Sequence, residues 1–134
     1  MKNFKSILVI AMLMISTSIF AQSNAKVIAI VNKADWCSIC KTYASRTVAT
    51  FTENNKDNYF QFIVNDITDK ETKKASKPAI EKVGLVKMQS AISASGVLTF
   101  YDARTHKMLG QITVANSEEE VAATMKNVRE LASK

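Results

Sequence analysis

Residues 26–41 read KVIAIVNKADWCSICK, in which an apolar run is followed at once by two cysteines. The run 26–32 is rich in β-branched side chains, which predicts a strand buried on both faces. Residues 42–54 contain neither Gly nor Pro, so we expect a helix that begins near Cys37 and ends near residue 53. The stretch therefore predicts a strand that leads directly into a helix, with Cys37 and Cys40 at the junction.

The position of the two cysteines favours thiol chemistry. Amides in the first turn of a helix lack an internal acceptor, and the helix dipole adds partial positive charge there. Such a position lowers the pKa of a cysteine from about 8.5 to roughly 3.5–7.5. We expect Cys37 to be the exposed nucleophile and Cys40, one turn further along, to be the more buried resolving residue. Since a bridge across two residues closes a very small loop, redox chemistry or metal capture is a better reason for the pair than stability.

The rest of the chain alternates strands and helices, and residues 85–95 favour no single element. The other predicted elements are, in order, a strand at 59–65, a charged helix at 66–77, a short helix from Pro78 that ends before Gly84, strands at 97–102 and 108–114 that form a hairpin, and a last helix after a capping box of Ser117 and Glu120. This order predicts one α/β domain with a central mixed sheet and helices on both of its faces.

The WCSIC motif at 36–40, the strand before it, the late hairpin and the last helix resemble the thioredoxin-like family. The resemblance covers nearly all of residues 27–131. It implies a three-layer α/β sandwich and a thiol–disulfide oxidoreductase that acts on protein thiols and disulfides. It also implies that Cys37 attacks and Cys40 resolves, while Trp36 shields the site and shapes the surface that meets the substrate.

Three departures from the family pattern bear on this expectation. The family's cis-proline before the third sheet strand is replaced by Gly96, with Ser95 before it, and these two residues with Trp36 are the expected substrate-binding residues. The family's buried acid, six residues before the first cysteine, is replaced by Val31. The two residues between the cysteines are Ser and Ile rather than Gly and Pro. Lower efficiency is therefore expected, and the direction of exchange stays open.

Two other functions stay open at this point. Without a shielding proline, the two thiolates could hold a soft ion such as Cu(I). Structural zinc needs four ligands, and His106 is the only histidine in the sequence, so zinc is disfavoured. The other alternative is a thioredoxin-like binding module with an inert disulfide. For the oxidoreductase itself we expect no cofactor and no bound metal.

The N-terminus predicts export. Lys2 and Lys5 precede an apolar stretch at 6–20, and the small residue Ala21 follows it. This is the pattern of a secretory signal peptide cleaved after Ala21, and the stretch is shorter than the roughly 20 apolar residues that span a bilayer. We therefore expect a periplasmic or otherwise exported protein whose mature part, 22–134, is one thioredoxin-like domain. An uncleaved N-terminal anchor is the alternative, and would be the chain's only contact with a membrane.

Charge and compartment narrow the expected partners. The lysines between residues 70 and 82 alternate with acidic residues and have no aromatic neighbours, which indicates a solvated helix face rather than a nucleic-acid surface. Disulfides persist in exported proteins. The expected partners are therefore protein thiols and disulfides, with a membrane electron donor or acceptor and without nucleic acid.

Overall fold

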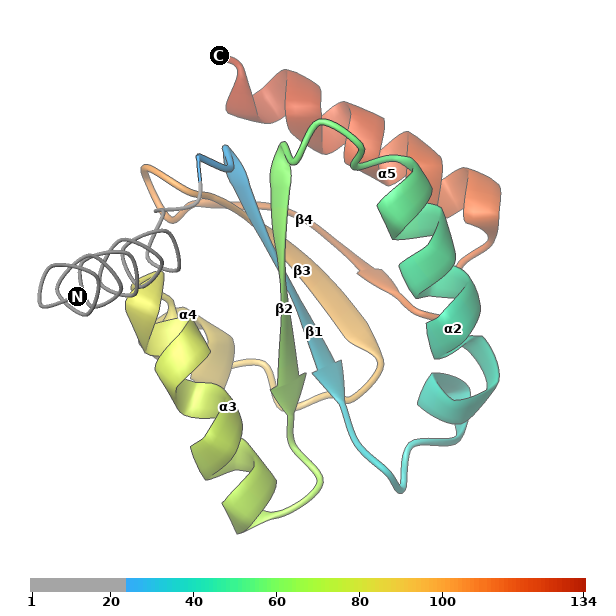
Figure 1. Cartoon of the computed structure of the whole chain (residues 1–134), viewed down its shortest axis with the longest axis vertical. Coiled ribbons are helices and arrows are strands. Elements are labelled where there is room, and N and C mark those ends of the chain that lie inside the picture. The colour runs from blue at the N-terminus through green and yellow to red at the C-terminus, as the bar shows by residue number, and fades with distance from the viewer. Residues whose placement is uncertain (1–23) are drawn as a thin grey trace, which may run out of the picture.

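The computed structural model describes residues 24–134, and the expected signal peptide at 1–21 lies outside them. The elements are β1 (Val27–Lys33), α2 (Ser38–Glu53), β2 (Phe60–Asp66), α3 (Lys70–Lys82), α4 (Val86–Ser90), β3 (Val97–Asp102), β4 (Met108–Thr113) and α5 (Glu118–Ala132), as Figure 1 shows. Within the described part, no helix is both long enough and apolar enough to cross a membrane.

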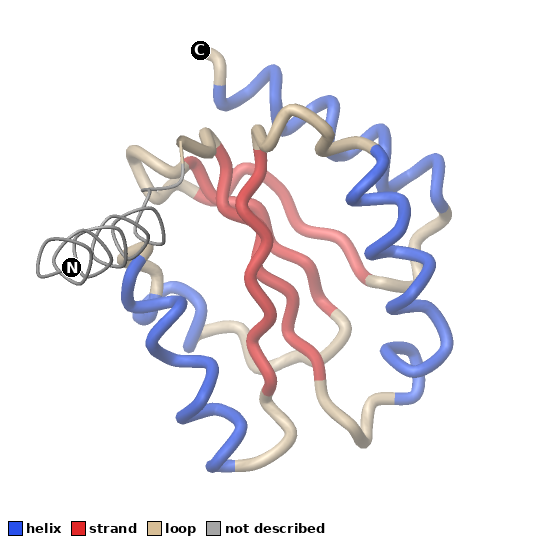
Figure 2. Tube along the Cα trace, viewed as in Figure 1, coloured by secondary structure: helices blue, strands red, loops and turns tan. Residues whose placement is uncertain are grey.

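The four strands form one mixed sheet in the order β2-β1-β3-β4 (Figure 2). β1 and β2 are parallel, with Val27 opposite Phe60, because α2 carries the chain back to the same end of the sheet. β3 is antiparallel to both β1 and β4. The predicted mixed sheet, including its hairpin, is confirmed.

The strand β1 is the centre of the core. Its first six residues are buried, as predicted from its apolar sequence. Val27, Ala29 and Val31 pack in the cluster that includes the buried face of α5, whereas Ile28 and Ile30 pack in the cluster on the side of α3 and α4. Helices therefore cover both faces of the sheet, and the three layers are visible in Figure 1.

The helix α5 forms where its sequence predicts. The Ser117 side chain accepts a hydrogen bond from the Glu120 amide and the Glu120 carboxylate accepts one from the Ser117 amide, which confirms the capping box. Val121, Met125 and Val128 are fully buried against the sheet. This face fixes the last helix beside α2, so it supports the element that begins at the cysteines.

The charged segment after β2 differs from its prediction, because the two expected helices are one. α3 begins at Lys70 since Asp69 caps it, and it continues through Pro78 to Lys82. A proline inside a helix leaves the carbonyl four residues earlier without a donor. Pro78 and Lys74 are both exposed, so water can hydrate that carbonyl. Gly84 follows the C-cap with φ of 74°, as predicted for a glycine at a helix end.

Candidate active site

The first cysteine caps the helix that follows it. Cys37 has extended backbone angles, α2 begins at the next residue, and the Cys37 Sγ accepts a hydrogen bond from the Cys40 amide at 3.2 Å. The sulfur therefore occupies the place that a serine or aspartate oxygen takes in an ordinary N-cap. The predicted placement of this sulfur at the positive end of the helix dipole is confirmed.

The second sulfur lies on the same side of the helix, one turn further on. Cys37 and Cys40 form a disulfide bond, with 5.3 Å between their Cα atoms. This separation lies inside the range that disulfides tolerate. The structure therefore shows the oxidised state of the pair, and reduction would leave the Cys37 thiolate beside the same amide donor.

The prediction that Cys37 is exposed is wrong. Cys37 has 5% of its surface accessible and Cys40 has 7%, so Cys40 is not the more buried of the two. The two cysteines form a buried cluster with Ala34, and Ile39 and Ile67 pack against this cluster. Both isoleucines are only half-buried and Trp36 is 62% exposed, so the disulfide lies directly beneath the surface.

The segment at the family's cis-proline position does lie beside the cysteine loop. A Cβ added to Gly96 would meet Ile39 Cδ1 at 2.6 Å, which places Gly96 against a residue between the two cysteines. Its φ of 73° is a left-handed conformation that favours glycine. No peptide bond among residues 24–134 is cis. The position is therefore occupied by a left-handed glycine instead of a cis-proline.

The peptide groups of this segment differ in what they bind. The Gly96 amide donates to the Asn32 carbonyl at 2.7 Å, and the Gly96 carbonyl accepts from the Val114 amide at 2.8 Å. Ser95 is half-buried, and within residues 24–134 its peptide groups have no hydrogen-bond partner. Of the two predicted substrate-binding residues here, Ser95 is the one whose backbone is available to an incoming chain.

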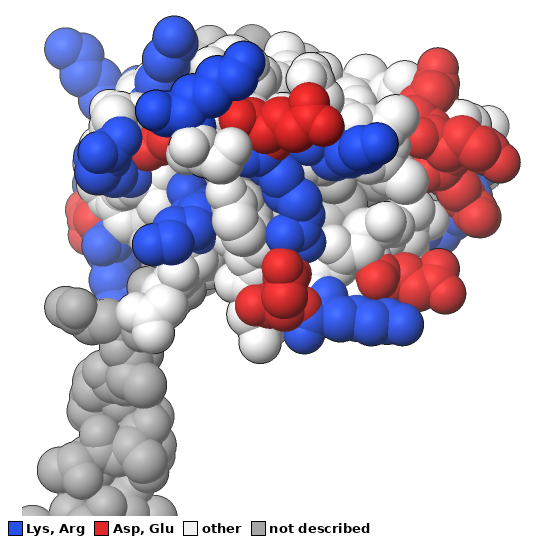
Figure 3. Space-filling view, turned by 90° about the horizontal axis from the view of Figure 1, so that it is seen from above, with Lys and Arg blue, Asp and Glu red and all other residues white. Residues whose placement is uncertain are grey.

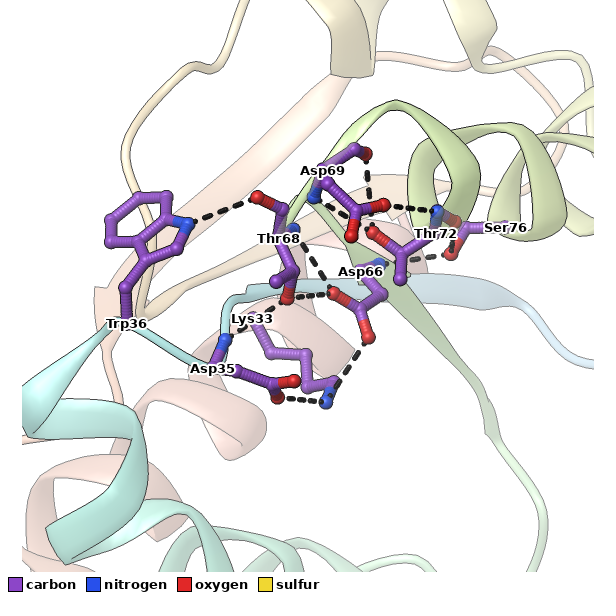
Figure 4. Close-up of polar contacts among 8 residues, drawn as sticks. All are labelled: Lys33, Asp35, Trp36, Asp66, Thr68, Asp69, Thr72 and Ser76. Atoms are coloured by element: carbon purple, nitrogen blue, oxygen red, sulfur yellow. Dashed lines mark hydrogen bonds and ion pairs between the residues drawn. The ribbon is translucent and has the colours of Figure 1, made fainter.

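Trp36 is held by the loop between β2 and α3, as Figure 4 shows. Its indole N–H donates to the Thr68 carbonyl at 3.1 Å, and the Asp35 amide donates to the Thr68 hydroxyl oxygen at 3.0 Å. The Thr68 hydroxyl in turn donates to an Asp66 carboxylate oxygen. Thr68 therefore fixes the turn that precedes Cys37. Our sequence reasoning did not identify it, because it lies more than thirty residues away in the chain.

An ionic cluster lies behind this turn (Figure 4). The Lys33 ammonium is 3.1 Å from a carboxylate oxygen of Asp35 and 3.1 Å from one of Asp66. Hydrogen bonds to Asp66 and then Asp35 raise the pKa of Lys33. Burial opposes ionisation of Asp66, but hydrogen bonds from Thr68 and Lys33 outweigh it and lower the pKa of that carboxyl. Lys33 and Asp66 therefore stay ionised at neutral pH, and their ion pair stabilises the turn.

The position of the family's buried acid is apolar. Val31 lines a cavity of about 120 Å³ that also borders Cys40. The other lining side chains include Thr47, whose hydroxyl donates to the Val114 carbonyl, and Lys33, which is the only charged residue there. None of the described residues that line this cavity carries a carboxylate to exchange a proton with Cys40.

The only histidine lies too far away to join the cysteines. His106 is in the turn between β3 and β4, at the end of the sheet where Val27 pairs with Asp102. Cys37 follows the other end of β1, which is roughly 20 Å away along a strand of this length. Among residues 24–134, no group of three His, Cys, Asp or Glu side chains is placed to hold a metal ion. A metal held by Cys37 and Cys40 would therefore find no third such ligand in this part of the chain.

No protein-family model matches the sequence, and no curated protein matches it. Solved structures do match. The oxidoreductase DsbH is 16% identical, with a TM-score of 0.58, over 79% of this chain and 74% of that one. A thioredoxin of Malassezia sympodialis is 15% identical, with a TM-score of 0.51, over 79% and 80%. Trxlp from Edwardsiella tarda EIB202 is 15% identical, with a TM-score of 0.50, over 81% and 89%. At such identities the likeness extends to the fold alone.

Proposed function

We propose that this chain, which has the thioredoxin fold, is a thiol–disulfide oxidoreductase that exchanges disulfides with proteins through Cys37 and Cys40. One observation carries the proposal, namely the hydrogen bond from the Cys40 amide to the Cys37 sulfur at the start of α2. This donor and the helix dipole favour a thiolate over a thiol at Cys37. A thiolate is the species that attacks disulfides.

The exchange proceeds in two displacements. The Cys37 thiolate attacks one sulfur of the substrate disulfide; that bond breaks, and the other substrate sulfur leaves as a thiolate. The mixed disulfide is then attacked at the Cys37 sulfur by the Cys40 thiolate, which forms the intramolecular bridge and releases the second substrate thiolate. The substrate gains two electrons and the Cys37–Cys40 pair loses two. Run backwards, the same steps oxidise a dithiol.

The remaining site residues orient the substrate. Trp36 is exposed beside Cys37 and fixed by Thr68, so it offers a flat apolar surface to the approaching chain. Ser95 has an unpaired peptide group next to the cysteine loop and can bind the substrate backbone. The disulfide is buried in a cluster against which Ile39 and Ile67 pack, so we expect an incoming substrate to displace side chains of this cluster before its sulfur meets Cys37. This cover lowers the rate for small or poorly docked disulfides.

The second displacement is expected to be the slow one. Cys40 must lose its proton before it attacks, and the Val31 side chain stands where the family has an acid. Among the described residues, the lining of the cavity beside Cys40 has no carboxylate to accept that proton, so the proton leaves to water or to the departing thiolate. Turnover therefore depends more steeply on pH than it would with an acid at this position.

The proposal includes export. The support is in the sequence, where two lysines, an apolar stretch at 6–20 and Ala21 form a signal-peptide pattern. A disulfide between Cys37 and Cys40 is compatible with an oxidising compartment. As a reductase outside the cytoplasm, the chain would receive electrons from a membrane donor; as an oxidase, it would deliver them to a membrane acceptor.

A second candidate function is a binding module with an inert disulfide. The observation that favours it is the burial of both cysteines, with only 5% of Cys37 accessible. An inert bridge has no need of an accessible sulfur. In that case the exposed Trp36 and the surface around it would bind a partner without any covalent step.

The reduction potential of the Cys37–Cys40 pair tests the proposal. Equilibration of the mature chain with glutathione buffers, followed by thiol alkylation, is expected to give a value between roughly −270 and −120 mV. Structural disulfides have potentials below about −300 mV, so a value there would support the inert module instead. The pKa of Cys37, measured on the reduced sample by thiolate absorbance, is expected to lie below the ordinary value near 8.5.

A further inference from the structure

A cleft of about 500 Å³ lies between α3 and α4, on the opposite side of the sheet from α2. Its apolar part is formed by Ile67, Ile80, Val86 and Ile92. We refer to it as the lysine cleft, because Lys73, Lys74 and Lys77 also line it. Neither the description of the redox pair nor the proposed exchange accounts for this cleft.

The buried polar groups of the lysine cleft are already satisfied. The Gln89 side chain, 2% exposed, donates to the Asn32 side-chain oxygen at 2.8 Å and accepts from the Tyr101 hydroxyl at 2.9 Å. The side-chain amide of Asn65 donates to the same side-chain oxygen of Asn32. The base of the cleft therefore presents apolar surface to a ligand. The charged groups that can bind a ligand are the lysines at its rim.

The rim carries unbalanced positive charge. Within residues 24–134, no Asp or Glu is among the lining residues. Lys77 has Glu81 at 3.4 Å, but Lys73 and Lys74 form no ion pair with any residue of the described part. In the face of the molecule drawn in Figure 3, basic side chains predominate on the left and acidic ones on the right. The lysine cleft therefore complements an anionic ligand with apolar groups.

The lysine cleft begins where the disulfide is covered. Ile67 lines the cleft and also packs against the small cluster that Ala34 forms with Cys37 and Cys40. At the same end, Ser93 lines the cleft two residues before Ser95, whose peptide groups are available. A polypeptide that places its sulfur at Cys37 and continues toward α3 therefore enters the cleft.

We infer that the lysine cleft is the docking surface for an acidic, partly apolar segment of the protein whose disulfide exchanges at Cys37. The inference rests on the proposed function and adds a substrate class to it. A polypeptide fits better than a nucleic acid, because none of the described residues that line the cleft is aromatic and could stack on bases. The lysines bind the carboxylates, while the isoleucine and valine side chains bury the apolar residues between them.

The test uses two synthetic peptides that each carry one cysteine in a disulfide with 2-mercaptoethanol. Leucine and glutamate residues flank the cysteine in one peptide, and leucine and glutamine residues flank it in the other. The uncharged bis(2-hydroxyethyl) disulfide reports basal exchange. Wild type is compared with Lys73→Glu/Lys74→Glu, and with Lys56→Glu/Lys126→Glu as a control of equal charge change on exposed lysines elsewhere.

Wild type and the control are expected to prefer the acidic peptide in kcat/KM by roughly tenfold, mainly through KM. The Lys73→Glu/Lys74→Glu variant should lose this preference and keep its basal rate. Raising the ionic strength from about 0.05 M to about 0.5 M should weaken the preference in wild type. An equal preference in all three proteins would overturn the inference.

Failure of the proposed function would look different, because no disulfide would then be exchanged at all. In that event, calorimetry with the acidic peptide, its cysteine replaced by serine, tests the lysine cleft by itself. Binding that is lost in Lys73→Glu/Lys74→Glu and kept in the control would support an acidic ligand. Equal affinity for the acidic and glutamine peptides would overturn it.

Discussion

The indole N–H of Trp36 donates a hydrogen bond to the carbonyl oxygen of Thr68, at 3.1 Å. The bond joins the residue before the first cysteine to the loop that follows β2. The hydroxyl of the same threonine accepts a hydrogen bond from the Asp35 amide and donates one to the Asp66 carboxylate. One side chain therefore holds both the turn before Cys37 and the Asp66 carboxylate of the ionic cluster. The geometry of the substrate surface at Trp36 therefore depends on a loop that contains no cysteine.

Replacing Thr68 by valine is expected to loosen this turn. The variant keeps the backbone carbonyl of residue 68, which accepts from the Trp36 indole, but it leaves the Asp35 amide without its acceptor. The free energy of unfolding should therefore fall by about 1–2 kcal/mol. Trp36 is the only tryptophan in the chain, so its fluorescence should report greater mobility. Urea unfolding and fluorescence anisotropy measure the two effects.

Thr52→Val is the matched control for this change. The Thr52 hydroxyl bonds only within α2, to the Val48 carbonyl, on an exposed part of the helix. Its loss should change the unfolding free energy by no more than about 0.5 kcal/mol. Equal effects of Thr68→Val and Thr52→Val would contradict the role given to Thr68.

The two cysteines should respond differently to substitution. Cys37→Ser removes the attacking sulfur but leaves a good helix cap, so turnover should fall to the uncatalysed rate while the fold is kept. Cys40→Ser leaves the attack intact and removes the resolving step, so mixed disulfides with substrate should accumulate. Non-reducing electrophoresis and mass spectrometry detect these adducts. Equal activity in both variants would contradict the assignment of Cys37 as the attacking residue and Cys40 as the resolving residue.

The features predicted correctly from the sequence are those that local patterns determine. The apolar strand ahead of Cys37, the helix after it and the capping box of Ser117 and Glu120 each depend on residues close together in the chain. The order of these elements was enough to predict the mixed sheet and the placement of the Cys37 sulfur at a helix end. The position of Gly96 near the cysteines was implied by the resemblance to the thioredoxin-like family, and Gly96 does lie against Ile39.

The features that were missed depend on contacts between distant segments. Cys37 is buried in a cluster against which Ile67, thirty residues later, packs, and no periodicity in the sequence indicates this. Thr68 reaches Trp36 across the same separation. Pro78 is a different case: its sequence predicts the start of a helix, but it lies inside α3, where its exposed position lets water hydrate the carbonyl that loses its donor.

Gly96 is expected to resist substitution. In Gly96→Ala, the new Cβ would meet Ile39 at 2.6 Å, and the φ of 73° disfavours alanine. Together these effects should lower the unfolding free energy by about 1–3 kcal/mol. In an Ile39→Ala background the clash is absent, so Gly96→Ala should cost roughly 1 kcal/mol less there than in wild type. A thermal or urea double-mutant cycle measures this difference.

Gly110→Ala provides the comparison for the glycine experiment. Gly110 lies in β4 without a positive φ, and its nearest contact for a Cβ is a Val128 methyl at 3.3 Å. The substitution should be milder than Gly96→Ala. If the changes in unfolding free energy of Gly96→Ala and Ile39→Ala were strictly additive, the two residues would not be in contact. That result would contradict the placement of Gly96 against the cysteine loop.

Low pH should weaken the link between α5 and the turn before β2. Two guanidinium nitrogens of Arg129 donate to the two carboxylate oxygens of Asp57, at 2.7 and 2.8 Å. The Arg129 hydrogen bond is the largest cause that lowers the pKa of Asp57 from 3.8 to about 2. Because the folded pKa lies below the unfolded one, the contribution to stability is complete above pH 4 or so and is lost as the pH falls toward about 2.

Asp57→Asn isolates this contribution from those of other carboxyls. The variant lacks the titrating group, so the difference in urea midpoint between wild type and variant should be largest near about pH 6 and should shrink toward about pH 2. Added salt should reduce the difference at the higher pH, since both side chains are partly exposed. A difference that stays constant across this range would mean that Asp57 acts through its hydrogen bonds to the turn alone, without its charge.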